Sequence, residues 1–261
     1  EKPAAETLKM AAVDFRAVRA RLRAGPTPRE EPKKEEADVG VVWTTDCGVW
    51  DAALARPVPE ALEAAPRRVR YCGEFATLAE EAALLRCLPE DDAAVWTRVT
   101  GGRLVAKFSG DKTPAVLAAV ATTLAKTVEG VPPLDHVLLN SYAPGQGVMP
   151  HTDGPAYEPV TAALSLGQDR LLSFRPRNGE ATSCSCAVLL RRRSLVVFDH
   201  DAYVTHTHGL GDAFEETVDC ACANLRLAAA APGDVLHVTD RRLSITFRAH
   251  RHESTSGDVD S

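Results

Sequence analysis

A His-x-Asp tripeptide, His151 and Asp153, contains the residues that point most directly to chemistry. At alternate positions of an extended segment, an imidazole and a carboxylate face the same way and can share one metal ion. Two histidines and one carboxylate form the facial triad that holds non-haem Fe(II) and leaves coordination positions open for a co-substrate and dioxygen. The tripeptide alone is a weak signal, because a chain of 261 residues with 8 His contains such a match readily by chance.

Further polar residues stand in strand-like runs on both sides of this tripeptide. Asn140-x-Tyr142 precedes it across a Pro144-Gly145 turn, and the two side chains point the same way from a strand. A third metal ligand can come from His206 or His208, which share one facing in an extended run and are therefore both open. Imidazole and carboxylate ligands favour an iron-dependent oxygenase over a thiolate zinc site.

Two arginines, Arg242 and Arg248, lie in the last strand-like run of the chain. A guanidinium group matches a carboxylate with two parallel hydrogen bonds and stays charged when it is buried. Without the metal motif, such a pair would be an ordinary exposed feature of an edge strand. Beside the motif, the pair indicates a binding site for an anionic cofactor.

Four segments of the chain resemble the AlkB branch of the Fe(II)/2-oxoglutarate-dependent dioxygenases. They are Asn140-Ser-Tyr142-Ala-Pro-Gly, His151-Thr-Asp153, His208-Gly209 and Arg242-Leu-Ser-Ile-Thr-Phe-Arg248. Within that branch, the runs 136–142, 149–155 and 164–167 look like the group formed by the sixth mammalian AlkB homologue and its plant and algal relatives. The resemblance extends from about Val69 to Arg248 and is densest from His136 to Arg175.

The resemblance implies a dioxygenase that uses Fe(II), 2-oxoglutarate and O2, with His151, Asp153 and His208 as its metal ligands and catalytic residues. His208 is preferred to His206 because the family places a glycine directly after this ligand, and Gly209 stands there.

The resemblance also implies which residues hold 2-oxoglutarate. Arg242 would pair with its distal carboxylate, and Asn140 and Tyr142 would add hydrogen bonds to it. Arg248 would lie near the metal and its carboxylate ligand. Ser244 stands where several relatives have Asn, which leaves its own contact with the cofactor open.

The implied reaction is oxidative demethylation or hydroxylation of alkylated nucleic acid. If the oxidised carbon is an N-methyl group on a base, the hydroxymethyl product loses formaldehyde. The base must then be flipped or single-stranded, so RNA or single-stranded or damaged DNA is the expected partner. Two alternatives stay open: the same chemistry on a protein or small molecule, and a weakly active nucleic-acid-binding module.

The net charge of the chain does not by itself favour binding to nucleic acid. The formal net charge is −6, and residues 66–250 contain 19 Lys and Arg against 21 Asp and Glu. Phosphate binding therefore needs a local basic patch. Three basic groups are candidates, although a solvated face is the favoured interpretation of each. They are Arg67, Arg68 and Arg70; Arg98, Arg103 and Lys107; and Arg191, Arg192 and Arg193.

Composition divides the chain into three parts. Residues 1–65 are expected to be a partly disordered extension, with a helix over 10–23, a charged and proline-rich linker over 25–36, and Trp43 and Trp50 beyond it. Trp50 and Trp43 are expected to pack against the catalytic core. Residues 66–250 form the predicted dioxygenase domain, and residues 251–261 a disordered tail.

Several properties of the whole chain set its expected surroundings. No apolar run of 18 residues appears, so no membrane span is expected. The 7 Cys favour reduced thiols and a cytoplasmic or nuclear location. The pairs Cys184-x-Cys186 and Cys220-x-Cys222 could form a second metal site, but buried small side chains are the favoured interpretation. The oligomeric state stays open, with a monomer as the default.

The predicted elements suit a mainly β domain with bracing helices. Amphipathic helices are expected over 76–88, with an acidic face, and over 113–128, with Thr113 as its N-cap. Strands are expected over 136–142, 160–166, 171–175, 184–190, 194–199, 202–206, 235–239 and 243–248. The resemblance implies that they form a double-stranded β-helix of the jelly-roll or cupin type. The stretch 209–233 is expected to be a mobile surface loop.

Overall fold

The computed structural model describes residues 50–91, 93–177 and 186–251. The chain divides into two compact units, 1–38 and 39–261, and all the described residues belong to the second. The expected helix over 10–23, the linker over 25–36, Trp43 and Cys184 lie outside the described residues, as does the expected tail after Arg251. Within the described part of the chain, no helix is long and apolar enough to cross a membrane.

Two antiparallel sheets form the barrel of the described unit, beside a two-stranded sheet. The large sheet contains β1 (Glu60–Ala61), β2 (Val69–Cys72), β10 (Leu195–Asp199), β7 (Val160–Leu166), β14 (Arg242–Arg248), β5 (His136–Tyr142), β4 (Leu104–Ser109) and β3 (Thr97–Arg98), in this order. The small sheet contains β6 (Val148–His151), β11 (His206–Leu210), β8 (Arg170–Pro176) and β9 (Cys186–Leu190). From β5 on, the chain passes back and forth between strands of the large sheet (β5, β7, β10 and β14) and strands of the small sheet (β6, the hairpin of β8 and β9, and β11). This alternation between two facing sheets confirms the predicted double-stranded β-helix.

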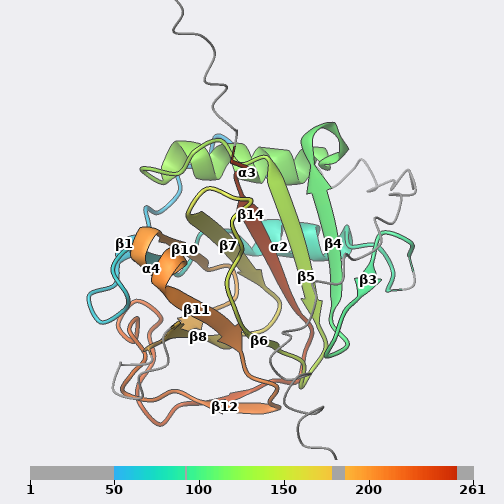
Figure 1. Ribbon diagram of the computed structural model, residues 1–261. Helices are drawn as coiled ribbons and strands as arrows, with labels where there is room; N and C mark the ends of the chain where they lie inside the picture. The colour runs from blue at the N-terminus through green and yellow to red at the C-terminus, as the bar shows by residue number, and fades with distance from the viewer. Residues whose placement is uncertain (1–49, 92, 178–185, 252–261) are drawn as a thin grey trace, which may run out of the picture. The chain divides into compact units, whose positions relative to one another are not determined.

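Helices cover one face of the large sheet, and the small sheet lies on the other side (Figure 1). The covering helices are α2 (Leu78–Arg86) and α3 (Ala115–Thr127), with a 3-10 turn, η1, at Gly110–Lys112. The short α4 (His200–Thr205) instead joins β10 to β11 and buries Ala202 and Tyr203 in the core on the side of the small sheet. The core between the helices and the large sheet includes Leu84 of α2 and Leu117 and Leu124 of α3, all buried. The second core fills the space between the sheets.

Alternation along the strands of the large sheet decides which side chains reach each core. In β14, Leu243, Ile245 and Phe247 pack toward the helices, so the residues between them point into the space between the sheets. The same parity in β5 sends Asn140 and Tyr142 into that space. Both faces of these strands are therefore buried, and the inner face carries the polar residues.

The two predicted helices form, with differences at their first residues. Helix α2 has a capping box, in which Thr77 Oγ1 accepts from Glu80 N at 3.2 Å and Glu80 Oε2 accepts from Thr77 N at 2.8 Å. Its expected acidic face is wrong, because Glu80 and Glu81 are buried and paired with arginines. Thr113 is not the N-cap of α3; Pro114 holds that position, because Thr113 ends η1.

Six of the eight predicted strands coincide with barrel strands, with bounds shifted by two residues or fewer. The strand expected over 202–206 is wrong, because His200–Thr205 form α4 and the strand follows as β11. The strand expected over 235–239 is β13 (Val235–His237), which pairs with β12 (Glu215–Thr217) outside the barrel sheets. Strand β6 was missed, because it is a four-residue edge strand containing a proline.

The stretch 209–233 is not the mobile loop that its composition predicts. Asn224, 1% exposed, accepts from Leu189 N at 2.8 Å and donates to Leu189 O at 2.9 Å, so it continues the hydrogen bonding of β9. At its start, buried Arg170 pairs with Glu216 at 3.0 Å and donates to the carbonyl of Gly211. These contacts fix the stretch against the small sheet.

The segment before residue 66 also packs against the described unit. Trp50 Nε1 donates to Thr123 Oγ1 of α3 at 2.9 Å, which agrees with the expected packing of Trp50 on the core. Arg56 pairs with Glu80, and Leu62 is buried in the second core.

Cysteine chemistry differs from expectation at one residue. The thiols of Cys72, Cys220 and Cys222 are free, whereas Cys87 is disulfide-bonded, so the expectation of reduced thiols is wrong for Cys87.

Candidate metal centre and active-site cavity

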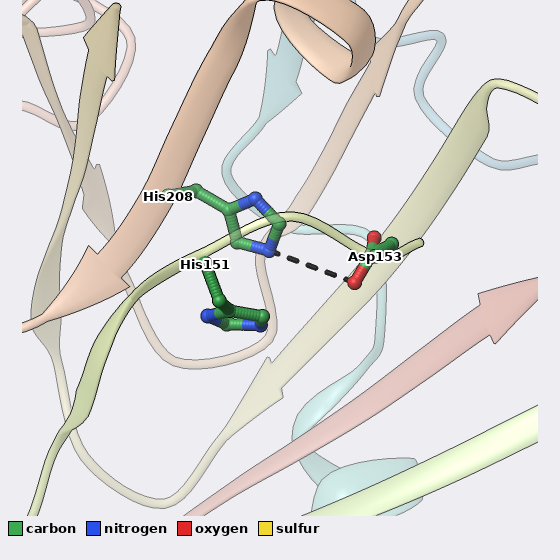
Figure 2. A group of neighbouring side chains, drawn as sticks. All are labelled: His151, Asp153 and His208. Carbon is green, nitrogen blue, oxygen red and sulfur yellow. Dashed lines mark ion pairs between the residues drawn. The ribbon is translucent and has the colours of Figure 1, made fainter. Parts of the chain in front are cut away.

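Three side chains from two neighbouring strands and the following loop converge at one point. His151 ends β6 and lies opposite His208 of β11 in the antiparallel register, and Asp153 follows two residues after β6. One ligand atom from each lies within 4.8 Å of the other two. Figure 2 shows the three side chains directed toward one another. Among the described residues, this is the one group of His, Cys, Asp or Glu side chains that could hold a metal ion.

The hydrogen bond of one imidazole and the burial of the other suit metal binding. His151 Nδ1 lies 2.9 Å from the carbonyl oxygen of Met149, so the tautomer with hydrogen on Nδ1 leaves Nε2 free to bind a metal. Burial lowers the pKa of His208 to about 4, which keeps its imidazole neutral at physiological pH. The phenyl rings of Phe198 and Phe174 stand 4.8 and 6.2 Å from the His208 ring and provide that burial.

His206 lies outside this group. Its Nδ1 faces Thr205 Oγ1 at 2.8 Å, and the residue pairs with Pro176 two positions along β11 from His208. The structure therefore brings His208 rather than His206 to the metal-binding group, in agreement with the preference from the sequence.

The carboxylate of Asp153 is held by donors on both oxygens. Thr161 Oγ1 of β7 donates to Oδ2 at 2.5 Å, and Arg248 Nη2 of β14 donates to Oδ1. Oδ1 also lies 3.8 Å from His208 Nε2. Burial opposes the charged form, but the Arg248 guanidinium and the hydrogen bond from Thr161 outweigh it and hold the pKa of Asp153 below its usual value. Asp153 is thus an ionised, oriented carboxylate, as a metal ligand must be.

A cavity between the two sheets opens beside these three residues. It encloses about 560 Å³ of empty space, a figure that includes its open mouth. The cavity wall combines apolar residues of both sheets with a few polar groups. The polar and charged lining residues are Arg103, Asn140, Tyr142, His151, Thr161, His208, Arg242, Ser244, Thr246 and Arg248.

Arg242 is an unusual buried cation at the wall of this cavity. It is 2% exposed, and one nitrogen, Nη2, donates to Ser165 Oγ at 3.1 Å. Its Nε and Nη1 are buried without a hydrogen-bond partner among the described residues. Burial lowers its pKa to about 10, so it stays charged at neutral pH. A buried guanidinium with two unused donors fits a carboxylate ligand, because each unmade hydrogen bond of a buried charge is costly.

The register of β14 on β5 gathers the other predicted cofactor residues around Arg242. Arg242 lies opposite Tyr142 and its guanidinium stands 5.3 Å from the Tyr142 ring centre, while Ser244 lies opposite Asn140. Asn140 Oδ1 accepts from Arg103 Nε at 3.3 Å. All five residues line the same cavity as His151 and His208.

The three basic groups proposed from the sequence differ in whether their side chains form ion pairs. Arg68 and Arg70 pair with buried Asp199. Arg191, Arg192 and Arg193 pair with Asp169, Glu81 and Glu74. In the group of Arg98, Arg103 and Lys107, no side chain forms an ion pair with a described residue. Arg103 reaches the cavity, and Arg98 interacts with Asp91 and lowers the pKa of that carboxylate.

Some residues of the site were missed by sequence reasoning. Thr161 and Ser165 lie in an apolar strand and give no signal of their own, although their parity in β7 separates them from the helix-facing Val160, Ala162 and Leu164. The second metal site considered for the cysteine pairs does not form around Cys220 and Cys222 among the described residues, since one thiol is exposed and the other buried.

Comparison with known proteins agrees with this geometry. Residues 54–248 match the model of the 2OG-Fe(II) oxygenase superfamily. The chain is 30% identical over 203 residues to the "Probable RNA/DNA demethylase ALKBH6" of Danio rerio, which covers 70% of this chain and 86% of that protein. It is 30% identical over 121 residues to the Xenopus tropicalis "tRNA (carboxymethyluridine(34)-5-O)-methyltransferase alkbh8", covering 45% of this chain and 19% of that protein.

Solved structures with a similar course of the chain include OsALKBH1 and a Pseudomonas putida prolyl-4-hydroxylase. The first gives a TM-score of 0.47 and 16% identity over 71% of this chain and 98% of that chain. The second gives 0.45 and 16% over 70% and 92%. The match of the superfamily model to most of the chain, and the long alignment with ALKBH6, show that this chain belongs to the AlkB family of the 2OG-Fe(II) oxygenases.

Proposed function

We propose that this dioxygenase binds Fe(II) through His151, Asp153 and His208, binds 2-oxoglutarate through Arg242, and oxidatively demethylates N-methylated bases in nucleic acid. The observation that carries the proposal is the pair of unpartnered donors on buried Arg242, in the same cavity as the His-Asp-His group. A dicarboxylate co-substrate would supply a carboxylate to Arg242 at one end and a second carboxylate for the metal held by His151, Asp153 and His208 at the other.

The residues of the chain have separate tasks in this reaction. When bound, Fe(II) with 2-oxoglutarate and O2 supplies the oxidation of a C–H bond, with succinate and CO2 as the other products. Three protein ligands fix the metal and leave its remaining positions open. Arg242 orients the co-substrate, and Phe174 and Phe198 keep water from the side of His208.

Charge at the cavity supports a nucleic-acid substrate. In the group of Arg98, Arg103 and Lys107, Arg103 and Lys107 form no ion pair with a described residue, whereas Arg98 lies opposite Leu104 on the helix side of the large sheet and interacts with Asp91. Arg103 lines the cavity, and Lys107 shares its strand parity on β4. Free guanidinium and ammonium groups beside a catalytic cavity suit phosphate contacts. The Danio rerio relative named as a probable RNA/DNA demethylase supports the same substrate class.

The chemistry of the substrate follows from the position of the metal group inside a cavity. A methylated base must leave its stack to reach that group, so single-stranded substrates are expected to react faster than duplexes. Oxidation of an N-methyl group gives an N-hydroxymethyl group, which breaks its C–N bond to release formaldehyde and return the base to its N–H form.

The test is formaldehyde release by the full chain with Fe(II) and 2-oxoglutarate. The panel contains N-methylated single-stranded RNA and DNA, the matching duplexes, and an N-methylated lysine peptide. Release from single-stranded oligonucleotides supports the proposal, and release from the peptide alone overturns the substrate class.

Matched variants test the role of the basic group. Lys107→Ala should raise the KM for the oligonucleotide and reduce the salt slope of binding by about 1, while the KM for 2-oxoglutarate is retained. Arg226→Ala is the control, because Arg226 is an exposed arginine paired with Glu60 on the surface. Equal effects of the two replacements would contradict a specific phosphate contact.

A further inference from the structure

Three aromatic rings form a cluster beside Arg248, outside the set of metal and cofactor residues. The rings of His136, Tyr157 and His250 lie with their centres 4.9 to 5.2 Å apart in each pair. His136 begins β5 and Tyr157 belongs to the loop that follows Asp153, so the cluster ties this loop to the start of an inner strand of the large sheet. Tyr157 and His250 also form an isolated antiparallel bridge.

Polar contacts fix the cluster in place. The Tyr157 hydroxyl lies 3.3 Å from His136 Nε2. Asp135 Oδ1 accepts from the backbone N–H of His250 at 2.8 Å and faces its Nδ1 at 3.2 Å. Arg251 Nε donates to the carbonyl of Tyr157 at 2.9 Å. The Tyr157 ring therefore has a defined position before any ligand binds.

Arg248 connects this cluster to the metal group. Its guanidinium carbon lies 5.2 Å from the centre of the Tyr157 ring, and its Nη2 donates to Asp153 Oδ1. Arg248 is also the cross-strand partner of His136. Its Nε is buried without a hydrogen-bond partner among the described residues, so the carboxylate and the aromatic ring supply the directional contacts of the guanidinium.

We propose that Tyr157 is a positioning residue for the metal centre, whose ring holds the Arg248 guanidinium against Asp153. This inference rests on the proposed function, because it requires Asp153 to bind Fe(II). A cation held over an aromatic face loses freedom to rotate away, and this position is partly desolvated, where such contacts are strongest. With Arg248 fixed, the Asp153 carboxylate keeps the orientation that the metal needs.

Loss of the ring should therefore weaken metal binding without touching a ligand. Outer contacts of metal ligands typically change metal affinity 10- to 100-fold, and a residue one contact further out is expected at the lower end, about tenfold. The π-face of the ring carries the effect, so Tyr157→Phe should bind Fe(II) nearly as the wild type does. Tyr157→Leu keeps most of the apolar volume and lacks the π-face, so it should show the loss.

The test is anaerobic calorimetric titration of the full chain with Fe(II) alone. The proteins compared are the wild type, Tyr157→Phe, Tyr157→Leu, Arg248→Ala and the Tyr157→Leu/Arg248→Ala double variant. Phe214→Ala serves as a control for removing an aromatic ring, because Phe214 is exposed and packs against Gly145. The expected result is a roughly tenfold higher Kd for Tyr157→Leu and no further rise when this change is added to Arg248→Ala.

Two results would overturn the inference. One is an unchanged Kd for Tyr157→Leu, and the other is an additive loss in the double variant, since a residue that acts through Arg248 cannot act in its absence. Should Tyr157→Leu fail to fold, Tyr157→Met and His250→Ala probe the same contact, and unchanged Kd values in both would have the same meaning. Asp153→Ala separates this inference from the proposed function, because unaltered Fe(II) binding there would refute the metal site itself.

Discussion

Thr161 Oγ1 lies 2.5 Å from Asp153 Oδ2 and donates a hydrogen bond to it across the start of β7. The other oxygen, Oδ1, accepts from Arg248 and lies on the side of His208. The two donors fix the rotation of the carboxylate about its last bond. Asp153 therefore presents Oδ1 toward the two imidazoles, where the proposed metal binds.

The contact with Thr161 predicts the effect of a nearly isosteric change. Thr161→Val removes the hydroxyl and should weaken Fe(II) binding about tenfold, because a partner that orients a metal ligand typically contributes 10- to 100-fold. Thr161→Ser keeps the hydroxyl and should bind nearly as the wild type does. Metal titration of both proteins checks this, and equal affinities would show that Arg248 alone orients the carboxylate.

Removal of Arg242 should affect the co-substrate rather than the metal. Truncating one side of a buried charge pair typically costs about 3 to 5 kcal/mol, so Arg242→Ala should raise the 2-oxoglutarate concentration required roughly a hundredfold or more. Arg242→Lys should restore only part, because an ammonium group cannot make the paired contact. Titration with 2-oxoglutarate in the presence of Fe(II) measures the change.

The neighbouring Arg241 is the matched control for this experiment. It pairs with Asp91 near the surface and donates to Ser141 Oγ at 3.2 Å, so Arg241→Ala should leave 2-oxoglutarate affinity unchanged. Unchanged affinity in Arg242→Ala would instead make Arg242 structural and move the carboxylate contact to another cation of the cavity, such as Arg103 or Arg248.

The two histidines of β11 should differ sharply in their effects. His208→Ala removes an imidazole of the metal group and should abolish Fe(II)-dependent turnover of 2-oxoglutarate. His206→Ala removes a side chain that faces Thr205 and should be mild. Succinate formation by the two folded proteins is the measurement. The reverse order of effects would place the third ligand two residues earlier.

Buried Glu81 predicts a dependence of stability on pH. Burial opposes its charge, but hydrogen bonds from Arg192, the backbone N–H of Gly167 and Arg193 outweigh it and lower the pKa of Glu81. Because the folded-state pKa is depressed, the stabilisation is present above the unfolded value of about 4.3 and is lost as the pH falls through the folded-state pKa.

Glu81→Gln should therefore destabilise the protein at neutral pH by about 1.5 to 3 kcal/mol, the usual contribution of hydrogen bonds to a charged group. The difference from the wild type should shrink as the pH falls below about 4. Urea unfolding at several pH values measures it, with exposed Glu63→Gln as the control. A difference that is independent of pH would show that the charge of Glu81 contributes nothing.

The strands of the barrel were largely predictable because burial on both faces leaves long apolar runs. The bounds of β5 and β7 match the sequence prediction residue for residue. Helix α4 was wrongly predicted as a strand. Ala202 and Tyr203 are adjacent and both buried, which a short helical turn allows and a half-exposed strand does not. Six residues are too few for a helical period to show.

The sequence predicted the metal-binding and cofactor-binding residues of the candidate site, but not the residues that form hydrogen bonds with them. The ligand types of His151, Asp153 and His208 are visible in the sequence, and their convergence depends on the pairing of β6 with β11. Nothing in the sequence shows that Arg242 keeps unpartnered donors, because Ser165 reaches it only through the packing of β7 on β14. The contact of Thr161 with Asp153 was missed for the same reason, because it depends on how β7 packs beside the loop after β6.

The central claim is that this chain couples 2-oxoglutarate turnover to removal of a methyl group from a base. The most direct measurement follows succinate, formaldehyde and the demethylated base together, with N-methylated single-stranded oligonucleotide, Fe(II) and the full chain, beside Asp153→Ala. The account predicts equal amounts of all three products from the wild type and none from the folded Asp153→Ala protein. Succinate from the wild type without formaldehyde or demethylated base across the methylated panel, or unchanged product formation by Asp153→Ala, would contradict it.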